Sequence, residues 1–291
     1  MNRIIIILLL LASGPLAFSQ GGLIRESLSL NSTILGKDVE YSLWLPPDYE
    51  QSNRRYPVLY LLHGYSDDET GWTQFGEVKA IADRQLSKDE MAAMIIVMPD
   101  AGVTWYINSH DGKVNYEDFF VKEFIPHIDK TLRTRTDRQY RAVAGLSMGG
   151  MGTCVLAMKH PDLFSTAAPL SAAVWIDEEI TGVPDENWSR GLGLVFGKDL
   201  KGKDRLTAHY RKNAAISIVN SANPDDLKKV RWYIDCGDKD FLIKGNMALH
   251  AAMIDRKIPH EFRVREGVHD WTYWRTALPE VFRFISTSFH R

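Results

Sequence analysis

The order of apolar and polar positions predicts a pair of strands near the N-terminus, followed by strands that alternate with helices. Residues 23–30 and 38–49 alternate apolar and polar side chains, which indicates an antiparallel pair that ends at Pro46 and Pro47. Later segments are either short apolar runs, typical of strands buried on both faces, or longer stretches with helical spacing. The predicted strands cover 56–62, 92–99, 140–146, 164–172, 230–236 and 260–266, and the predicted helices cover 116–132, 148–160, 244–257 and 271–289.

This alternation predicts the α/β class, with a mostly parallel sheet covered by helices on both faces. Residues 174–222 interrupt it, because they combine Trp175, Trp188, several glycines and scattered charges without a sustained period. A stretch of that length between two strands is more typical of a lid or an inserted subdomain than of a connecting loop. No linker rich in Pro, Gly or Ser divides the rest, so we expect a single domain over residues 20–291.

The first residues have the pattern of an export signal. Arg3 precedes an apolar run over 4–12, and Ala17 and Ser19 occupy the −3 and −1 positions of a cleavage before Gln20. The alternative is a membrane anchor, but this run is much shorter than the ~20 residues that a membrane span needs. We therefore expect residues 1–19 to be removed and the mature protein to be secreted or periplasmic, without a membrane segment.

Charge and cysteine content exclude several classes of partner and cofactor. The 291 residues have a formal net charge of −2, so no basic surface for nucleic acid is indicated. Cys154 and Cys236 are the two cysteines of the chain, and both lie in apolar segments, which favours buried free thiols. Neither has the neighbours that a zinc site requires, and we expect no metal and no cofactor.

The segment "RAVAGLSMGG" places Ser147 between Gly145 and Gly149, after a predicted buried strand and before a predicted helix. In that setting G-x-S-x-G forms a tight turn that exposes the serine hydroxyl at the edge of the sheet. A plain strand-to-helix turn is the alternative, but the flanking elements favour a nucleophile. Ser147 is the candidate nucleophile.

A serine nucleophile needs a histidine base and an acid that orients it. Among the histidines after Ser147, only His269 lies in a loop directly after the last predicted strand, at the same sheet edge as Ser147. The acid is expected in the loop after the strand at 230–236. Asp235 lies within the strand end and is interpreted as structural, whereas position alone does not separate Asp238 from Asp240.

The negative charge that develops on an ester carbonyl needs backbone N–H donors. The amide of Met148, directly after the candidate nucleophile, is the first candidate donor. The second is the amide of Tyr65, because Gly64 in "LLHGYSDD" allows the chain to turn toward the crevice.

Several of these segments together resemble a known esterase family, whose members include carbohydrate esterase family 1 feruloyl and acetylxylan esterases, S-formylglutathione hydrolase and the antigen 85 mycolyltransferases. The resemblance covers about residues 38–287 and is carried by "YPVLYLLHGYSDDETGW", "RAVAGLSMGG", "CGDKDFL" and "GVHDWTYW". It implies the α/β-hydrolase fold. The family's acid closes a G-x-x-D step, which corresponds here to Gly237 and Asp240, and its second oxyanion amide follows the His-Gly pair, which corresponds to Tyr65.

We therefore expect an exported serine carboxylesterase with Ser147, His269 and Asp240 as its triad. Its expected partners are small-molecule or polysaccharide esters, with feruloyl or acetyl groups of plant cell-wall xylan favoured by the export signal. A siderophore esterase or an acyltransferase would use the same triad, and a non-catalytic sugar- or lipid-binding module would lack part of it. The aromatic residues expected to line the cleft are Trp72, Trp105, Tyr106, Trp175 and Trp271.

Overall fold

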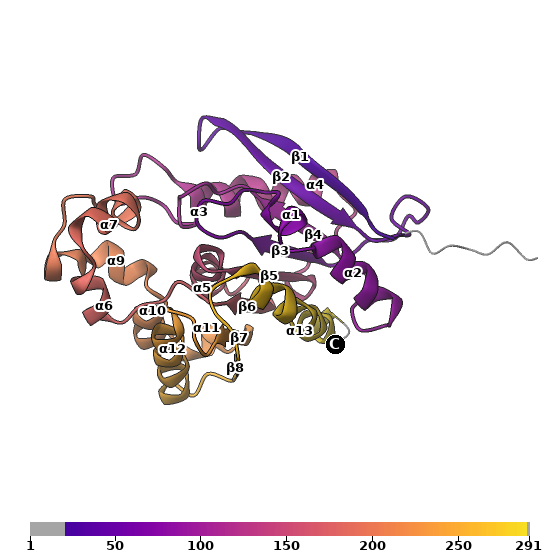
Figure 1. The fold of residues 1–291 in the computed structure, drawn as a ribbon. Helices are drawn as coiled ribbons and strands as arrows, with labels where there is room; N and C mark the ends of the chain where they lie inside the picture. The colour runs from indigo at the N-terminus through magenta and orange to yellow at the C-terminus, as the bar shows by residue number, and fades with distance from the viewer. Residues whose placement is uncertain (1–20, 290–291) are drawn as a thin grey trace, which may run out of the picture.

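The computed structural model describes residues 21–289, and an eight-stranded sheet forms its centre (Figure 1). The strand order is β1-β2-β4-β3-β5-β6-β7-β8. β2 pairs antiparallel with both of its neighbours, and all other pairs are parallel, so the predicted antiparallel start and mostly parallel sheet are confirmed. The strands are β1 (Leu23–Ser32), β2 (Lys37–Leu45), β3 (Val58–Leu62), β4 (Ile95–Pro99), β5 (Arg141–Leu146), β6 (Thr166–Leu170), β7 (Arg231–Gly237) and β8 (His260–Arg265).

The central strands bury side chains on both faces, as their continuous apolar runs predict. In β3, Val58, Tyr60 and Leu62 enter one core and Leu59 and Leu61 enter the other, because successive side chains point to opposite faces. The first core is covered by α3 (Tyr116–Phe119), α4 (Ile125–Thr131), α5 (Met148–Lys159), α10 (Ala215–Ser221) and α12 (Ile243–Asp255). The second core is covered by α1 (Gly71–Gln74), α2 (Val78–Ser87) and α13 (Trp271–Phe289).

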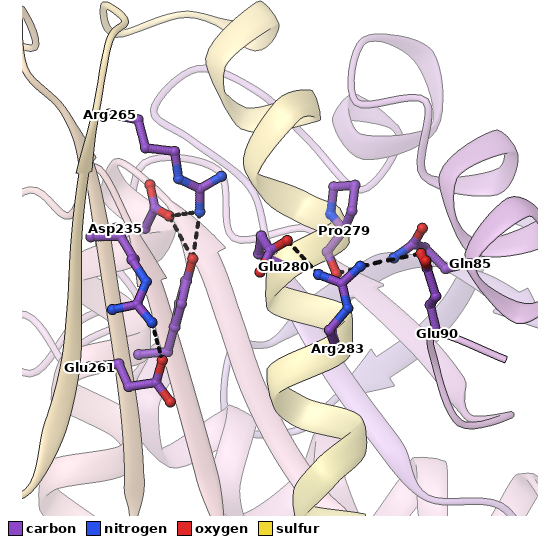
Figure 2. A network of polar contacts seen from close by, with 10 residues as sticks. Gln85, Glu90, Asp235, Glu261, Arg265, Pro279, Glu280 and Arg283 are labelled. Atoms are coloured by element: carbon purple, nitrogen blue, oxygen red, sulfur yellow. Dashed lines mark hydrogen bonds and ion pairs between the residues drawn. The ribbon is translucent and has the colours of Figure 1, made fainter. Parts of the chain in front are cut away.

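Polar contacts fix the long C-terminal helix α13 to its neighbours. Figure 2 shows Arg283 between Glu280 of the same helix and Glu90, which follows α2. Gln85 of α2 donates a hydrogen bond of 3.4 Å to the carbonyl oxygen of Pro279. α13 therefore has a fixed position along the sheet, and its first residues lie beside the loop that carries His269.

The insertion at 174–222 contains short helices where the sequence predicted no regular structure. Figure 1 shows α6, α7 and α9 together at one end of the molecule. Arg205 is fully buried among them, donates to the carbonyls of Ile180 and Val183, and lies over the ring of Trp188. Helices this short are not revealed by periodicity. They are α6 (Asp177–Gly182), α7 (Asp185–Arg190), α8 (Gly193–Phe196), η3 (Gly202–Arg205), α9 (Ala208–Asn213) and α10, with α11 (Pro224–Leu227) just after them.

Two further differences from the sequence-based expectation concern helices. The sequence reading did not identify α1 or α2, and the helix predicted over 116–132 is divided into α3, a π-helical turn (Phe120–Phe124) and α4. Pro126 lies at the start of α4, where a missing N–H costs little. Cys154 and Cys236 are buried free thiols, as predicted, and burial raises the pKa of each to about 12.

The predicted export signal, residues 1–19, lies outside the described residues. Within residues 21–289, no helix is both long enough and apolar enough to cross a bilayer.

Candidate active site

Ser147 lies on a strained turn between β5 and α5. Its φ of 54° is in the left-handed region, which a residue with a β-carbon rarely adopts. The turn is held by the main chain, because the Ser147 amide donates to the Leu170 carbonyl at 3.0 Å and its carbonyl accepts from the Ala173 amide at 2.9 Å. The serine is therefore fixed at the edge of the sheet by its backbone.

The flanking glycines are required by close approach of the main chain. A β-carbon on Gly145 would lie 2.7 Å from the Gly149 carbonyl oxygen, and one on Gly149 would lie 2.5 Å from the Leu62 carbonyl oxygen. Both distances are far shorter than real contacts of a β-carbon. The spacing of the motif is thus explained by a turn packed directly against the end of β3.

The structure brings Ser147, His269 and Asp240 together in one hydrogen-bonded chain. His269 Nε2 lies 2.9 Å from Ser147 Oγ, and His269 Nδ1 lies 2.8 Å from Asp240 Oδ2. Asp240 is 2% exposed, so water hardly reaches its carboxylate. Burial alone would raise the pKa of Asp240, but the hydrogen bonds from His269 and from the Leu242 amide outweigh it and hold the pKa below its usual value.

The other two aspartates of the same segment have different partners. Asp238 is exposed, and its Oδ1 accepts a hydrogen bond of 2.9 Å from the amide of Gly267. Asp235 is fully buried in β7 and contacts Tyr233, Tyr273 and Arg265. Of the three, Asp240 is the one within hydrogen-bonding distance of His269.

Met148 and Tyr65, which carry the two candidate oxyanion amides, both belong to segments that adjoin Ser147. Met148 begins α5, where the first N–H groups have no acceptor within the helix. Tyr65 follows Gly64, and a β-carbon on Gly64 would lie 3.8 Å from the β-carbon of Ser147. Neither amide donates a hydrogen bond to another group among residues 21–289, so both are available for an external acceptor.

His63 fixes the peptide that presents the Tyr65 amide. Its Nε2 accepts a hydrogen bond of 2.9 Å from the Ala101 amide, so its Nδ1 carries the proton and donates to the Gly64 carbonyl at 2.7 Å. Because a trans peptide directs its N–H opposite to its carbonyl, this bond also sets the direction of the Tyr65 N–H. The sequence analysis used the His-Gly pair as a turn signal and, through the family resemblance, to locate the oxyanion amide, but it missed this role of the His63 side chain.

The aromatic residues expected to line the cleft divide into two groups. Trp72 and Tyr106 are 1% and 0% exposed, so the expectation that they line a cleft is not met: their polar atoms bind the carbonyls of Leu62 and His63 in the interior. Trp105 is 7% exposed and contacts the rings of Tyr65 and Trp175, and Trp175 and Trp271 are half-buried.

Phe241 is a candidate contact residue that the sequence analysis missed. Its side chain is 70% exposed, and its ring centroid lies 4.6 Å from that of the His269 imidazole. The Trp274 ring also packs edge-on against the imidazole, with the centroids 4.9 Å apart, and donates through Nε1 to Ser171 Oγ. The available sequence signal for Phe241 was its place directly after the candidate acid Asp240.

The lining of one cavity includes none of the three triad residues. This cavity has a volume of about 960 Å³ between the loop at 103–114 and helices α8 and α9, and its lining includes Val103, His110, Leu194 and His209. Trp105 follows the lining residue Thr104 in the chain and contacts the ring of Tyr65, so this segment connects the cavity lining to the loop beside Ser147. Within residues 21–289, no group of three or more His, Cys, Asp or Glu side chains is arranged to hold a metal ion.

Residues 32–285 match the family described as "Putative esterase". The chain belongs to this esterase family. Esterase Rv1288 of Mycobacterium tuberculosis is 30% identical over 87% of this chain, and the chain spans 56% of that relative's length. The endo-1,4-beta-xylanase/feruloyl esterase of Xylanibacter ruminicola is 35% identical over 53% of this chain and 22% of its own length.

A solved structure of a ferulic acid esterase matches this esterase-family chain over nearly its whole length. The TM-score is 0.81 and the identity is 34%, with 92% of this chain and 99% of that chain covered. Structures of S-formylglutathione hydrolases, at 23% identity or less, share the fold. The α/β-hydrolase fold that the resemblance implied is confirmed.

Proposed function

We propose that this chain is an exported serine carboxylesterase that hydrolyses feruloyl or acetyl esters of plant cell-wall polysaccharide. The observation that carries the chemistry is the hydrogen-bonded chain from Asp240 through His269 to Ser147. Export is inferred from the pattern of residues 1–19, and the substrate from the relatives named for feruloyl ester hydrolysis.

In the first step Ser147 Oγ attacks the ester carbonyl, and His269 Nε2 takes the hydroxyl proton. The 2.9 Å separation places the base within reach of that proton. Asp240 accepts from Nδ1, which selects the tautomer with a free Nε2 and stabilises the imidazolium that forms. Its low pKa keeps it ionised for this purpose.

The amides of Met148 and Tyr65 receive the negative charge on the carbonyl oxygen. Each such donor is worth about 10²–10³ in kcat in enzymes of this kind. His269 then gives its proton to the departing alcohol, leaving the acyl group on Ser147. Water then attacks the acyl carbonyl while His269 takes its proton. His269 returns that proton to Ser147 Oγ as the acid is released, so these steps need no metal or cofactor.

The surroundings of Ser147 suit an aromatic acyl group better than a small one. Phe241 presents an exposed ring beside His269, and Tyr65 presents a 38% exposed ring beside the oxyanion amide. A flat ring such as that of ferulate can pack against either of them. Polysaccharide on the alcohol side can extend along the cavity of about 960 Å³, whose lining mixes apolar and hydrogen-bonding side chains.

A hydrolysis panel tests the proposal. Purified protein and its Ser147→Ala variant are assayed with methyl ferulate, acetylated xylan, p-nitrophenyl acetate and a siderophore lactone. We expect the highest kcat/KM for methyl ferulate and none of the four turned over by Ser147→Ala. A preference for the lactone, or acyl transfer in place of hydrolysis, would overturn the substrate assignment, and no turnover by the wild type would overturn the enzyme assignment.

A further inference from the structure

The loop that carries His269 is short, and both of its flanks contact one buried carboxylate. The loop lies between Arg265, the last residue of β8, and Tyr273, in the first turn of α13. The Arg265 guanidinium and the Tyr273 hydroxyl both donate to Asp235 on β7. Figure 2 shows Arg265 directed toward Asp235 beside α13.

Asp235 is unusually well supplied with donors for a side chain that is fully buried. The Tyr233 hydroxyl donates to Oδ2 at 2.7 Å, and Arg265 contacts the same oxygen and the Tyr233 hydroxyl. Burial, followed by the hydrogen bond to Asp235, raises the pKa of Tyr273 well above its usual value, so this hydroxyl stays a donor. A buried carboxylate is tolerated only with such partners, so removing one partner leaves a costly unpaired group.

These contacts constrain where the base can lie. The imidazole of His269 must reach Ser147 and Asp240 at the same time, and its main chain is set by where β8 ends and α13 begins. A carboxylate bound to both flanks fixes the distance between them. The hydrogen bond from Gly267 to Asp238 acts on the middle of the loop from an exposed side chain, where competition with water weakens it.

We propose that Asp235 is a positioning residue for His269, acting through Arg265 and Tyr273 on the two ends of the histidine loop. This inference rests on the proposed function, because it concerns the base of that reaction. It assigns separate roles to the three aspartates of one segment: Asp235 fixes the loop's flanks, Asp238 binds its backbone, and Asp240 orients the imidazole.

The test is Asp235→Asn in the full chain, assayed with p-nitrophenyl acetate well below its melting temperature. The amide keeps the shape but offers one acceptor oxygen and places an NH₂ group against donors. We expect kcat to fall by ~10²-fold, the loss expected for an ~1 Å misplacement of a catalytic group, with KM little changed. In a His269→Ala background the same substitution should cause no further loss, because its effect passes through His269.

The matched control is Glu117→Gln. Glu117 is also a buried carboxylate, but it pairs with Lys159 and His160 at the far end of α5 from Ser147. We expect it to lower the melting temperature and leave kcat unchanged. Two results would overturn the positioning role. One is that Asp235→Asn, like Glu117→Gln, lowers the melting temperature and leaves kcat unchanged. The other is that Asp235→Asn lowers kcat by the same factor in the His269→Ala background as in the wild type.

Two further variants keep the inference testable if Asp235→Asn does not fold. Tyr273→Phe and Arg265→Gln each remove one flank contact, and each should lower kcat by a smaller factor than Asp235→Asn. Unchanged kcat in both would overturn the inference. Ser147→Ala and His269→Ala are assayed in parallel: if they retain full activity the proposed function itself fails, whereas if they lose it and the flank variants do not, only the role of Asp235 fails.

Discussion

Ser147 Oγ and His269 Nε2 lie 2.9 Å apart, yet the two residues are held in place by different kinds of interaction. The serine turn is fixed by main-chain hydrogen bonds and by glycines packed so closely that a β-carbon has no room. The loops with Asp240 and His269 also have main-chain bonds, such as the one from the Lys239 amide to the Gly267 carbonyl, but in addition they are held by aspartate side chains that accept hydrogen bonds. One half of the candidate site depends on the shape of the main chain, and the other depends in addition on the charge of its aspartates.

The difference predicts how each half fails. A change of size at the serine turn is resisted by backbone atoms that cannot move separately, so it should distort the turn. A change of charge in the other half leaves donors without acceptors, so it should alter protonation and the position of the base. The substitutions below test this contrast.

Ser147→Ala should have the largest effect on activity and almost none on stability. It removes the nucleophile but keeps the turn, because the backbone bonds of residue 147 remain. By comparison with a serine protease triad, kcat should fall by up to about 10⁶. Turnover and the melting temperature of the same preparation check this, and retained turnover would exclude Ser147 as the nucleophile.

Asp240→Asn should come next, with a loss of about 10⁴ in kcat, because the amide favours the wrong tautomer of the base. Asp238→Asn is the matched variant, two residues away in the same loop. It loses one exposed bond to the Gly267 amide, and we expect a cost of ~1 kcal/mol in stability and little change in rate. The reverse result would move the acid to Asp238.

Gly149→Ala tests the half that depends on shape. The added β-carbon would meet the Leu62 carbonyl oxygen at 2.5 Å, so the turn must shift. We expect kcat to fall by ~10²-fold through misplacement of the nucleophile, with a stability loss of about 1–3 kcal/mol. These losses should be the same at pH 6 and pH 8, in contrast to losses from the charged half. A pH-dependent loss would count against the distinction.

Acidification should have the smallest effect, and it should act through a histidine pair that lies outside both halves of the candidate site. His250 on α12 and His260 at the start of β8 lie 2.6 Å apart through Nδ1 and Nε2, and burial, followed by the charge of His260, lowers the pKa of His250. A lowered pKa in the folded state means that the unfolded chain binds the proton first. The stability from this group is therefore present above about pH 6.5, the unfolded value, and is lost as the pH falls through the folded value.

The measurement is the melting temperature between pH 8 and pH 5 for the wild type and for His250→Gln. We expect a steeper fall for the wild type, because glutamine does not titrate. Parallel curves would show that the histidine pair does not contribute.

The sequence predicted the central strands β3, β4 and β5 well because they carry continuous apolar runs, as expected for burial on both faces. It missed α2, whose apolar residues Val78 and Ile81 lie among polar ones, and it missed the insertion helices, which are too short for a helical period to show. Their stability comes from contacts such as those of the buried Arg205, whose partners are 5 to 25 residues distant in the chain.

A local sequence pattern was sufficient to identify a candidate-site residue whose position is fixed within one segment. It was insufficient for residues whose role depends on a contact between two segments. The glycine spacing identified Ser147 as the candidate nucleophile. The residues alone did not decide whether Asp238 or Asp240 is the acid, and the resemblance to a family favoured Asp240. The structure places Asp240 against His269 and Asp238 against Gly267. The fixed tautomer of His63 depends on Ala101, a contact between distant segments that no local pattern shows.

The side chain of Tyr65 has a consequence for how this chain can be altered. Its hydroxyl donates to the Arg190 carbonyl at 2.7 Å, while its backbone belongs to the loop beside Ser147. The insertion enters and leaves the sheet between β6 and β7, and this hydroxyl is one of its contacts with the rest of the crevice. A chimera that replaced residues 174–222 with those of a relative would therefore require position 65 to be chosen together with the graft.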